Sequence, residues 1–526
     1  MMSNVFCIFK YTGWITAIQF MSLWFQVMAS AIQRMSLLIL VATQCCLAGN
    51  ILLLFFPVFS HITGPANVAK VLHDQGHNVT IAISNSQPLQ HKLKGKGVNI
   101  LVYDSLGDLD VSNEMEKGVL KGFSRMNLFK EISDKVLRDE QFLENIRAHR
   151  PDLIILESTP VIQMWVVIPY KLGIPFMFLG SINSPHYSRT PPLPSVVPYK
   201  MLDFTDQMTF QQRLLNTWAQ LEKYFHDPFT FSDVQIYAPE KPYISMYDLQ
   251  AKALLWIIID DSISGYGAPS MPNLKQISHL LTVTPKPLPP KFHFFVDNAK
   301  SGVVIVSFGS ILQSVPPAMV DKLLKAFKKT KYSFVIRHPT LNSSDPDKIL
   351  YGNWLPQYDL LCHKNTRLFI THCGANGQQE SVLAGVPMIG FPVFADQPNN
   401  AGRIVRKGFG LRLDLKNFSV EELVSAIEEV ITNPEYKMRT QKASTIIKAQ
   451  RVPPLDEAAF WINHILTFGG DHLKSFGQDI PFWQYLGLDV LLACLLVCHI
   501  IGFIFIKMLC FCIFWCFKKK EKIKKQ

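Results

Sequence analysis

Short apolar runs alternate with helical stretches along most of this chain, and the pattern occurs twice. In the first half the expected strands lie at 51–56, 79–83, 98–103, 152–156 and 175–179, with a helix at about 64–75 after the first of them. The second half restarts with strands at 303–308, 332–336, 367–371 and 386–391 and helices near 316–328, 374–384, 397–406 and 419–431. Alternation of this kind is typical of parallel sheets wound with helices. The sequence therefore predicts two doubly wound, Rossmann-like α/β domains that face a cleft.

Proline-rich stretches suggest how the two halves are divided. TPPLPSVVP at 190–198 interrupts the first half, and TPKPLPPKF at 284–292 indicates an interdomain linker. We expect an N-terminal domain at 49–285 and a C-terminal domain at 286–480. Residues 104–150 and 181–250, which are rich in Phe, Met and Tyr, are predicted to be irregular.

Both ends of the chain indicate a membrane protein. Leu486 to Ile506 carry a single charge, at Asp489, and 21 helical residues span roughly the 30 Å of a bilayer core. We expect a transmembrane helix at 484–506 and a basic cytoplasmic tail at 507–526, since lysines follow the apolar run. Residues 35–50 are typical of a signal peptide, so 1–48 are assigned to an upstream extension and that peptide. The prediction is a single-pass type I protein with a luminal body.

The tail also explains most of the positive charge. Of the formal net charge of +11, +6 lies between residues 507 and 526, and the body has no arginine-rich stripe, so nucleic-acid binding is excluded. The final residues resemble a dilysine signal for return to the endoplasmic reticulum. Of the ten cysteines only Cys362 and Cys373 lie in the body, so no disulfide framework is expected. The sequence contains neither a P-loop motif, GxxxxGK[ST], nor the dinucleotide-binding motif GxGxxG after the first strand, so both of these interpretations are rejected.

The segment FITHCGANGQQE at 369–380 points to a phosphate site. His372 ends an apolar run, and Gly374 to Gly377 form the turn into a helix. A helix N-terminus offers free N–H groups and about half a positive charge, which suits a phosphate. Glu380 lies further along the helix, where it could accept hydrogen bonds from a ribose. A purely structural glycine turn capped by His372 is the alternative.

The neighbouring residues favour the first interpretation. WLPQ begins at Trp354, and FADQPNN contains Asp396 and Gln397, which closes a stretch of 44 residues from Trp354. This stretch resembles the UDP-sugar box of the animal UDP-glycosyltransferases, a family with the GT-B fold. The resemblance extends over nearly the whole luminal body, the anchor and the basic tail.

The resemblance implies a set of residues that bind the UDP-sugar. Trp354 and Gln357 would contact the uridine, Glu380 the ribose, and Asp396 with Gln397 the sugar. The diphosphate would be bound by Ser310, His372, Gly374, Asn376, Gly377 and Asn400. Trp354 as an ordinary core residue and Asp396 as a simple helix cap are the alternatives. The sequence offers no cluster with metal-ligand spacing, and we expect neither a metal nor another cofactor.

The first half offers a catalytic base. His61 directly follows the first strand, and His titrates near the working pH. The family places its base at this position and orients it with an Asp at the end of a later strand. Here that position is Glu157, and Asp152 lies about 17 Å away along the strand. Glu157 could orient His61 with one more methylene or have no role.

These features predict an inverting glycosyltransferase that transfers a hexose, with glucose favoured, from a UDP-sugar to a small lipophilic acceptor in the endoplasmic reticulum membrane. Glucuronic acid as the sugar, and a catalytically silent UDP-sugar-binding protein, are the alternatives. Homo-oligomerisation is left open. Of three glycosylation sequons, Asn342 is the best candidate, Asn417 is a second, and Asn78 is doubtful because it opens a strand.

Overall fold

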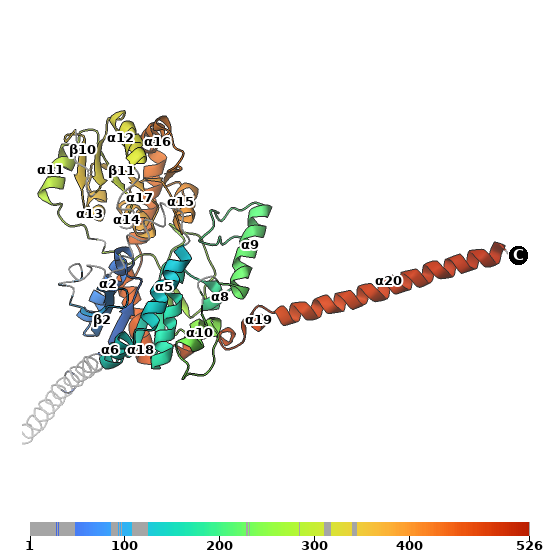
Figure 1. Ribbon diagram of the computed structural model, residues 1–526. Coiled ribbons are helices and arrows are strands. Elements are labelled where there is room, and N and C mark those ends of the chain that lie inside the picture. Colours follow the sequence, from blue (N-terminus) through green and yellow to red (C-terminus); the bar gives the residue numbers. More distant parts are fainter. Residues whose placement is uncertain are drawn as a thin grey trace, which may run out of the picture.

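The computed structural model describes residues 48–85, 97–107, 125–227, 232–282, 284–309, 317–338 and 345–524, with a few single positions between these ranges. It shows two lobes and one long helix that projects from them (Figure 1). The expected signal peptide, Ser310 and the sequon at Asn342 lie outside the described residues.

The N-terminal lobe is built on a parallel sheet of seven strands in the order β3-β2-β1-β4-β5-β6-β7. The strands are β1 (Asn50–Leu54), β2 (Asn78–Ser84), β3 (Asn99–Tyr103), β4 (Leu153–Glu157), β5 (Phe176–Gly180), β6 (Trp256–Ile259) and β7 (Leu274–Ile277). The central strands are buried on both faces, which their nearly unbroken apolar sequences require.

The helices of this lobe cover both faces of the sheet, apart from the helix at 210–225, whose inward side is bonded to residues 194–199. They are α2 (Phe59–Asp74), α5 (Arg125–Leu137), α6 (Glu140–His149), η1 (Pro160–Val166), α7 (Val167–Leu172), α8 (Pro185–Ser188), α9 (Phe210–Phe225), η2 (Val234–Ile236) and α10 (Met246–Ala251). Helix α2 begins directly after β1, five residues earlier than expected, so His61 lies in its first turn.

The C-terminal lobe repeats this design with six parallel strands in the order β10-β9-β8-β11-β12-β13. The strands are β8 (Val303–Ser307), β9 (Ser333–Arg337), β10 (Ile349–Gly352), β11 (Thr366–Thr371), β12 (Met388–Gly390) and β13 (Gly410–Arg412). The helices are α11 (Pro290–Asn298), α12 (Pro317–Lys328), α13 (Gln357–Leu361), α14 (Ala375–Ala384), α15 (Gln397–Arg406), α16 (Val420–Thr432) and α17 (Pro434–Lys448).

The chain then returns to the first lobe. Helix α18 (Pro454–Phe468) packs against α2, and its Ala458, Ala459 and Ile462 belong to the hydrophobic core of the N-terminal sheet. Figure 1 shows α18 at the base of the lower lobe. It therefore belongs by packing to the first lobe, although it follows the second sheet in sequence. The domain boundaries at 285 and 480 stay predictions.

The last elements lead to the projecting helix. They are η3 (Asp471–Leu473), η4 (Phe476–Gln478), α19 (Phe482–Tyr485) and α20 (Leu488–Lys524). Residues Leu488–Trp515 of α20 are long and apolar enough to cross a membrane. This candidate span extends beyond the expected end at 506, because the residues after Lys507 remain apolar.

The two predicted Rossmann-like domains are confirmed, with some elements missed. The segments expected to be irregular contain three helices of ten or more residues, α5, α6 and α9, as well as the shorter α8 and η2 and most of α10. Strands β6, β7, β10 and β13 were not predicted, since they are only three or four residues long and lie at or next to sheet edges.

Candidate active site

Both sheets reverse their strand order at the same relative place. Strand β1 lies beside β4 in the first sheet, and β8 lies beside β11 in the second. Ligands of such sheets bind beyond the carboxyl ends of the strands at this switch point. His61 and Glu157 follow or end the first pair of strands, and Gly309 and His372 follow the second. The fold thus places the candidate residues at the two positions where a ligand is expected.

His61 and Glu157 are in direct contact. The Glu157 Oε1 atom meets Nδ1 of His61, and Glu157 Oε2 accepts a hydrogen bond of 2.9 Å from the backbone N–H of Phe56. The Glu157 side chain is 9% exposed, whereas that of His61 is 27% exposed. Both oxygens of the carboxylate therefore have a partner. The Glu157 side chain, one methylene longer than Asp, does reach His61, which the sequence alone left open.

The electrostatics of His61 suit a base that becomes positively charged. Burial of the ring favours its neutral form, but the charge of Glu157 and the contact with it outweigh burial and raise the pKa of His61. Asp396, which comes from the other lobe, adds to the increase in pKa. Because Nδ1 faces Glu157, Nε2 is the ring nitrogen left for a substrate.

The predicted diphosphate residues surround the start of α14. The first backbone N–H groups of any helix have no intrahelical partner. Gly374, the N-cap of this helix, has no side chain that could cap them, so they remain open to a ligand. A Cβ atom at Gly309 or at Gly374 would lie 2.5 Å from Nε2 of His372. The two glycines thus leave room for that ring. Burial lowers the pKa of His372 to about 4, so the ring is neutral and can donate one hydrogen bond to an anion.

Trp354 lies where the lobes meet. It is 48% exposed, and its ring lies edge to face with Phe59 at a centroid distance of 4.9 Å. The guanidinium of Arg337 lies 5.1 Å from the centre of the Trp354 ring. The exposure argues against an ordinary core residue and leaves ring surface on which a planar base could stack.

Gln357 and Glu380 form a pair beside Trp354. The Gln357 side-chain amide donates to Glu380 Oε2. Burial raises the pKa of Glu380 to about 7, although the hydrogen bond from Gln357 acts in the opposite direction. Gly377 packs against Gln357 and Phe369, where a Cβ would lie 3.4 Å from the Phe369 ring. The geometry is compatible with the predicted role of the pair at the uridine.

The sugar end of the predicted site is held by a network at the start of α15. Asp396 Oδ2 accepts a hydrogen bond of 2.7 Å from Asn400, which also donates to the Cys373 carbonyl. Gln397 Oε1 accepts from the backbone N–H groups of Val393 and Phe394. Asp396 occupies the N-cap position but makes no side-chain capping bond, so it is not a simple helix cap.

Two residues of this region have a strained backbone. Cys373 and Ala395 adopt left-handed conformations, with φ of 65° and 54°. Such conformations cost of order 1 kcal/mol for a residue with a Cβ and concentrate at functional sites. Burial raises the pKa of the Cys373 thiol, and the side chain is fully buried, so Cys373 has a packing role.

Contacts between the lobes close the cleft. Asn376, predicted at the diphosphate, donates a hydrogen bond of 2.8 Å to the Ser60 carbonyl, next to His61. Arg403 forms a doubly hydrogen-bonded ion pair with Asp260, and Lys200 contacts the same carboxylate at 3.1 Å. Burial favours the neutral form of Asp260, but the two cations lower its pKa to about 2. These contacts therefore hold the candidate base, His61, opposite the residues that are predicted to bind the UDP-sugar.

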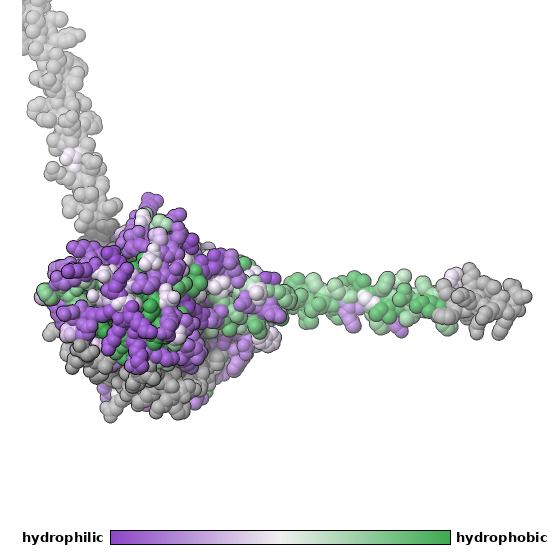
Figure 2. All heavy atoms as spheres, turned by 90° about the horizontal axis from the view of Figure 1, so that it is seen from above, coloured by the Kyte–Doolittle hydropathy of each residue, from purple (hydrophilic) through white to green (hydrophobic). Residues whose placement is uncertain are grey.

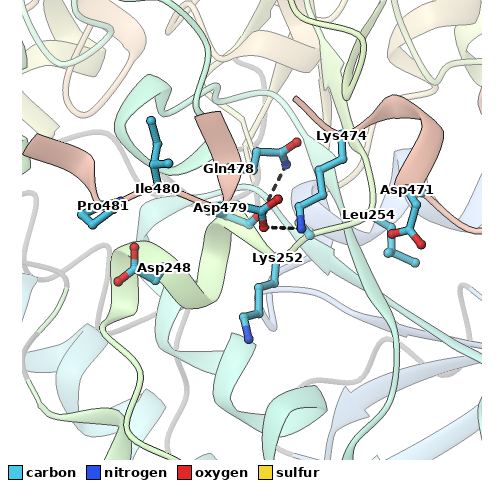
Figure 3. Close-up of a pocket in the computed structure, with 12 residues that line it drawn as sticks. Asp248, Lys252, Leu254, Asp471, Lys474, Gln478, Asp479, Ile480 and Pro481 are labelled. Carbon is cyan, nitrogen blue, oxygen red and sulfur yellow. Dashed lines mark hydrogen bonds and ion pairs between the residues drawn. The ribbon is translucent and has the colours of Figure 1, made fainter. Parts of the chain in front are cut away.

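A separate cavity lies outside this cleft. It has a volume of about 400 Å³ and lies between α10 and residues 470–481. Figure 3 shows charged side chains around it, among them Asp248, Lys252 and Lys474. Because it shares no residue with the predicted site and is charged, it does not match a site for a lipophilic acceptor. Within the described ranges, no group of three or more His, Cys, Asp or Glu side chains could hold a metal ion.

Sequence reasoning missed two neighbours of the site. Arg337 ends β9 and also donates to the Gly309 carbonyl, and Phe59 begins α2. The carboxyl end of a strand beside the switch point is the signal that could have identified Arg337.

Comparisons with known proteins show the family to which this chain belongs. The family model for UDP-glucoronosyl and UDP-glucosyl transferases matches residues 50–523. Human UDP-glucuronosyltransferase 2B7 is 30% identical over 92% of this chain and 98% of its own length. Mouse UDP-glucuronosyltransferase 1A7 is 28% identical over 93% of this chain and 96% of its own length.

Solved structures show the same fold at low identity. Os79 from O. sativa in complex with UDP has a TM-score of 0.57 and 18% identity, covering 79% of this chain and all, 100%, of that chain. The glycotransferase of kitacinnamycin also has a TM-score of 0.57, over 79% of this chain and 98% of its own. Because the family match runs from β1 almost to the end of α20, the chain belongs to the UDP-glucoronosyl and UDP-glucosyl transferase family and is a UDP-sugar glycosyltransferase.

Proposed function

We propose that this protein is a membrane-anchored, inverting hexosyltransferase, with glucose as the favoured sugar and the hydroxyl of a small lipophilic molecule as the acceptor. The observation that carries the proposal is the contact of His61 with Glu157, opposite the α14 N-terminus of the other lobe. A base is thereby positioned across the cleft from the residues predicted to bind the donor.

The reaction is a single displacement. His61 Nε2 removes the proton from the acceptor hydroxyl while the oxygen attacks the anomeric carbon of the sugar. The bond between that carbon and the β-phosphate oxygen breaks, and UDP leaves with the bonding electrons. Attack from the side opposite to UDP inverts the configuration. Glu157 stabilises the imidazolium that forms, consistent with the raised pKa of His61.

The leaving UDP is stabilised without a metal in this proposal. The N–H groups at the start of α14 and the neutral His372 donate to the diphosphate, where negative charge develops. Trp354 stacks on the uracil, Gln357 and Glu380 bind the uridine, and Ser310, outside the described residues, completes the phosphate site. Asp396 accepts hydrogen bonds from the sugar hydroxyls, and the side-chain NH₂ group of Gln397, whose oxygen is held by the Val393 and Phe394 N–H groups, donates to them.

The surroundings of Asp396 favour a neutral sugar. Lys200 and Arg403 are close enough to interact electrostatically with Asp396, and both are paired with Asp260. A sugar carboxylate beside Asp396 would require one of these cations to change partner. The similarity to proteins named UDP-glucuronosyltransferases nevertheless makes glucuronic acid the second candidate.

The C-terminal helix supports the proposed location. Leu488–Trp515 would anchor the protein, with the lysine-rich end in the cytoplasm and the two lobes in the lumen of the endoplasmic reticulum. Lipophilic acceptors partition into this membrane, so anchoring brings enzyme and acceptor together.

UDP release by microsomes that express the full chain tests the proposal. UDP-glucose and UDP-glucuronic acid are supplied in parallel with a panel of phenols and sterols, with and without EDTA. We expect acceptor-dependent UDP release from UDP-glucose that EDTA leaves unchanged. Release from UDP-glucuronic acid alone would overturn the choice of sugar, and loss of activity in EDTA would overturn the metal-free mechanism.

A further inference from the structure

Helix α9 has its polar and apolar sides reversed relative to an ordinary surface helix. Its buried residues are Asn216 and Tyr224, whereas a surface helix normally buries its apolar side. The outward side carries large apolar side chains that are between 38% and 71% exposed: Phe210, Leu214, Leu215, Trp218, Leu221 and Phe225. Such a face in water is unfavourable and marks an interaction surface.

The inward side of α9 is fixed to the lobe by hydrogen bonds. Asn216 donates to the carbonyls of Pro194 and Val197 and accepts from the backbone N–H of Tyr199. Thr209 and Gln212 form a capping box at the start of the helix. These polar contacts hold the helix in one orientation, so its apolar side cannot simply turn inward.

The root of the projecting helix lies directly beside α9. Phe482 of α19 packs against Phe225, the last residue of α9, with ring centroids 6.0 Å apart. Only Leu486 and Gly487 separate α19 from α20. Figure 1 shows α9 on the side of the molecule from which α20 leaves, running across the direction of α20. In Figure 2 apolar surface continues from the root of α20 onto the adjoining part of the body.

The segment before α20 is also fixed to the same lobe. Gln478 donates a hydrogen bond of 3.0 Å to the Ala251 carbonyl, and Arg189 lies 5.4 Å from the centre of the Tyr485 ring. Because two residues can extend only about 7 Å, the body cannot move far from the point where α20 would enter a bilayer. The orientation of the lobe toward that bilayer is therefore restricted.

We propose that the outward face of α9 lies in the luminal interface of the bilayer that α20 crosses. The face is rich in Phe, Trp and Leu, the residues that interfacial helices bury at the headgroup boundary. The inference rests on the proposed anchoring by α20. It adds a second contact with the membrane, which presents the N-terminal lobe to the layer in which lipophilic acceptors dissolve.

Photolabelling from lipid tests this contact in the full chain. The protein is reconstituted into phosphatidylcholine nanodiscs that contain a phosphatidylcholine with a diazirine on its acyl chain, and adducts are mapped by mass spectrometry. We expect adducts in α20 and on Leu214, Trp218 and their outward neighbours. The double variant Leu214→Glu/Trp218→Glu should reduce α9 adducts relative to α20 adducts by about tenfold or more, because charge is disfavoured in lipid.

A matched variant controls for exposed aromatic residues in general. Phe294 on α11 is 76% exposed and lies in the other lobe, so Phe294→Glu should leave the α9 adducts unchanged. Unchanged UDP binding by the double variant would show that it is folded. If α20 carries adducts and α9 does not, the inference about α9 is overturned, while the proposed anchoring by α20 stands. An unlabelled α20 would overturn both the anchoring by α20 and the membrane contact of α9. If α9 is labelled as strongly in the double variant as in the unmodified chain, the adducts do not depend on this face and the inference is overturned.

Discussion

Replacing Glu157 with Gln changes the charge at the centre of the proposed machinery and nearly preserves its shape. In the structure, one carboxylate oxygen accepts from the Phe56 N–H at 2.9 Å and the other faces His61 Nδ1. A Gln side chain can keep the first contact only with its oxygen, which turns its NH₂ group toward Nδ1. Because NH₂ donates, Nδ1 must accept, and the ring proton moves to Nε2. The nitrogen that should take the acceptor proton is then already protonated.

The expected loss is large and confined to turnover. Fixing a catalytic histidine in the wrong tautomer costs roughly 10³- to 10⁴-fold in kcat, or about 4 to 5.5 kcal/mol in activation free energy. The affinity for UDP should stay within about twofold, because the hydrogen bonds of Glu157 go to Phe56 and His61, neither of which is predicted to bind UDP. Steady-state UDP release and calorimetric titration with UDP measure the two quantities separately.

The pH profile provides an independent readout. His61 must be neutral to act as a base, and Glu157 raises the pKa of His61. Activity of the unmodified enzyme should therefore fall as the pH drops through this raised pKa. Removing the negative charge lowers the pKa, so the acidic limb of the residual kcat/KM should move to lower pH in Glu157→Gln.

Glu157→Asp is the matched control because it keeps the charge. Its shorter side chain cannot keep both contacts, and a displacement of about 1 Å predicts a loss of about 10- to 100-fold, smaller than that of the Gln variant. The reasoning is refuted if Glu157→Gln retains turnover within about threefold of the unmodified enzyme, or if its acidic limb does not move.

Four further outcomes are expected. Gly374→Ala should weaken UDP binding about tenfold or more, because its Cβ would lie 2.5 Å from the His372 ring; a titration with UDP would show unchanged affinity if the ring can shift. Trp354→Ala should raise the Kd for UDP about fivefold, since a stacking contact contributes about 1 kcal/mol, and Trp354→Phe should recover most of the loss. Arg403→Met should lower the free energy of unfolding by about 2 kcal/mol, because it leaves the partly buried Asp260 with Lys200 alone; an unchanged denaturant midpoint would contradict this. Cys373 in the folded protein should resist alkylation at pH 8, since its thiol is buried and its pKa is raised, whereas rapid modification would show that the strand end opens.

The sequence was a good guide wherever one physical pattern dominates. Buried parallel strands need long apolar runs, so β1, β2, β4, β5, β8 and β11 were predicted close to their observed positions. The glycines predicted the start of α14, and the free N–H groups and dipole of a helix N-terminus indicated a phosphate site there. The short edge strand β13 has only three residues and is defined by its pairing with β12, which no local signal reveals.

The parts of the site that could not be predicted depend on contacts between distant residues. Glu157 lies 96 positions from His61 in the sequence, so only the fold shows that its longer side chain reaches the ring. The Asn376 bond to Ser60 joins the two lobes over 316 positions. Helix α9 lies in a segment that was expected to be irregular, although its apolar residues at 210, 214, 218, 221 and 225 recur at helical spacing. Only the fold shows that this apolar side faces outward.

The most direct test of the central claim is the turnover of His61→Ala, measured as UDP release in microsomes beside the affinity of the same variant for UDP. His293→Ala, an exposed histidine on α11, serves as the matched control. The account predicts that His61→Ala loses at least about 100-fold in turnover, the contribution of a general base, and binds UDP as the unmodified chain does. Turnover within a few-fold of the unmodified chain would contradict the assignment of His61 as the base.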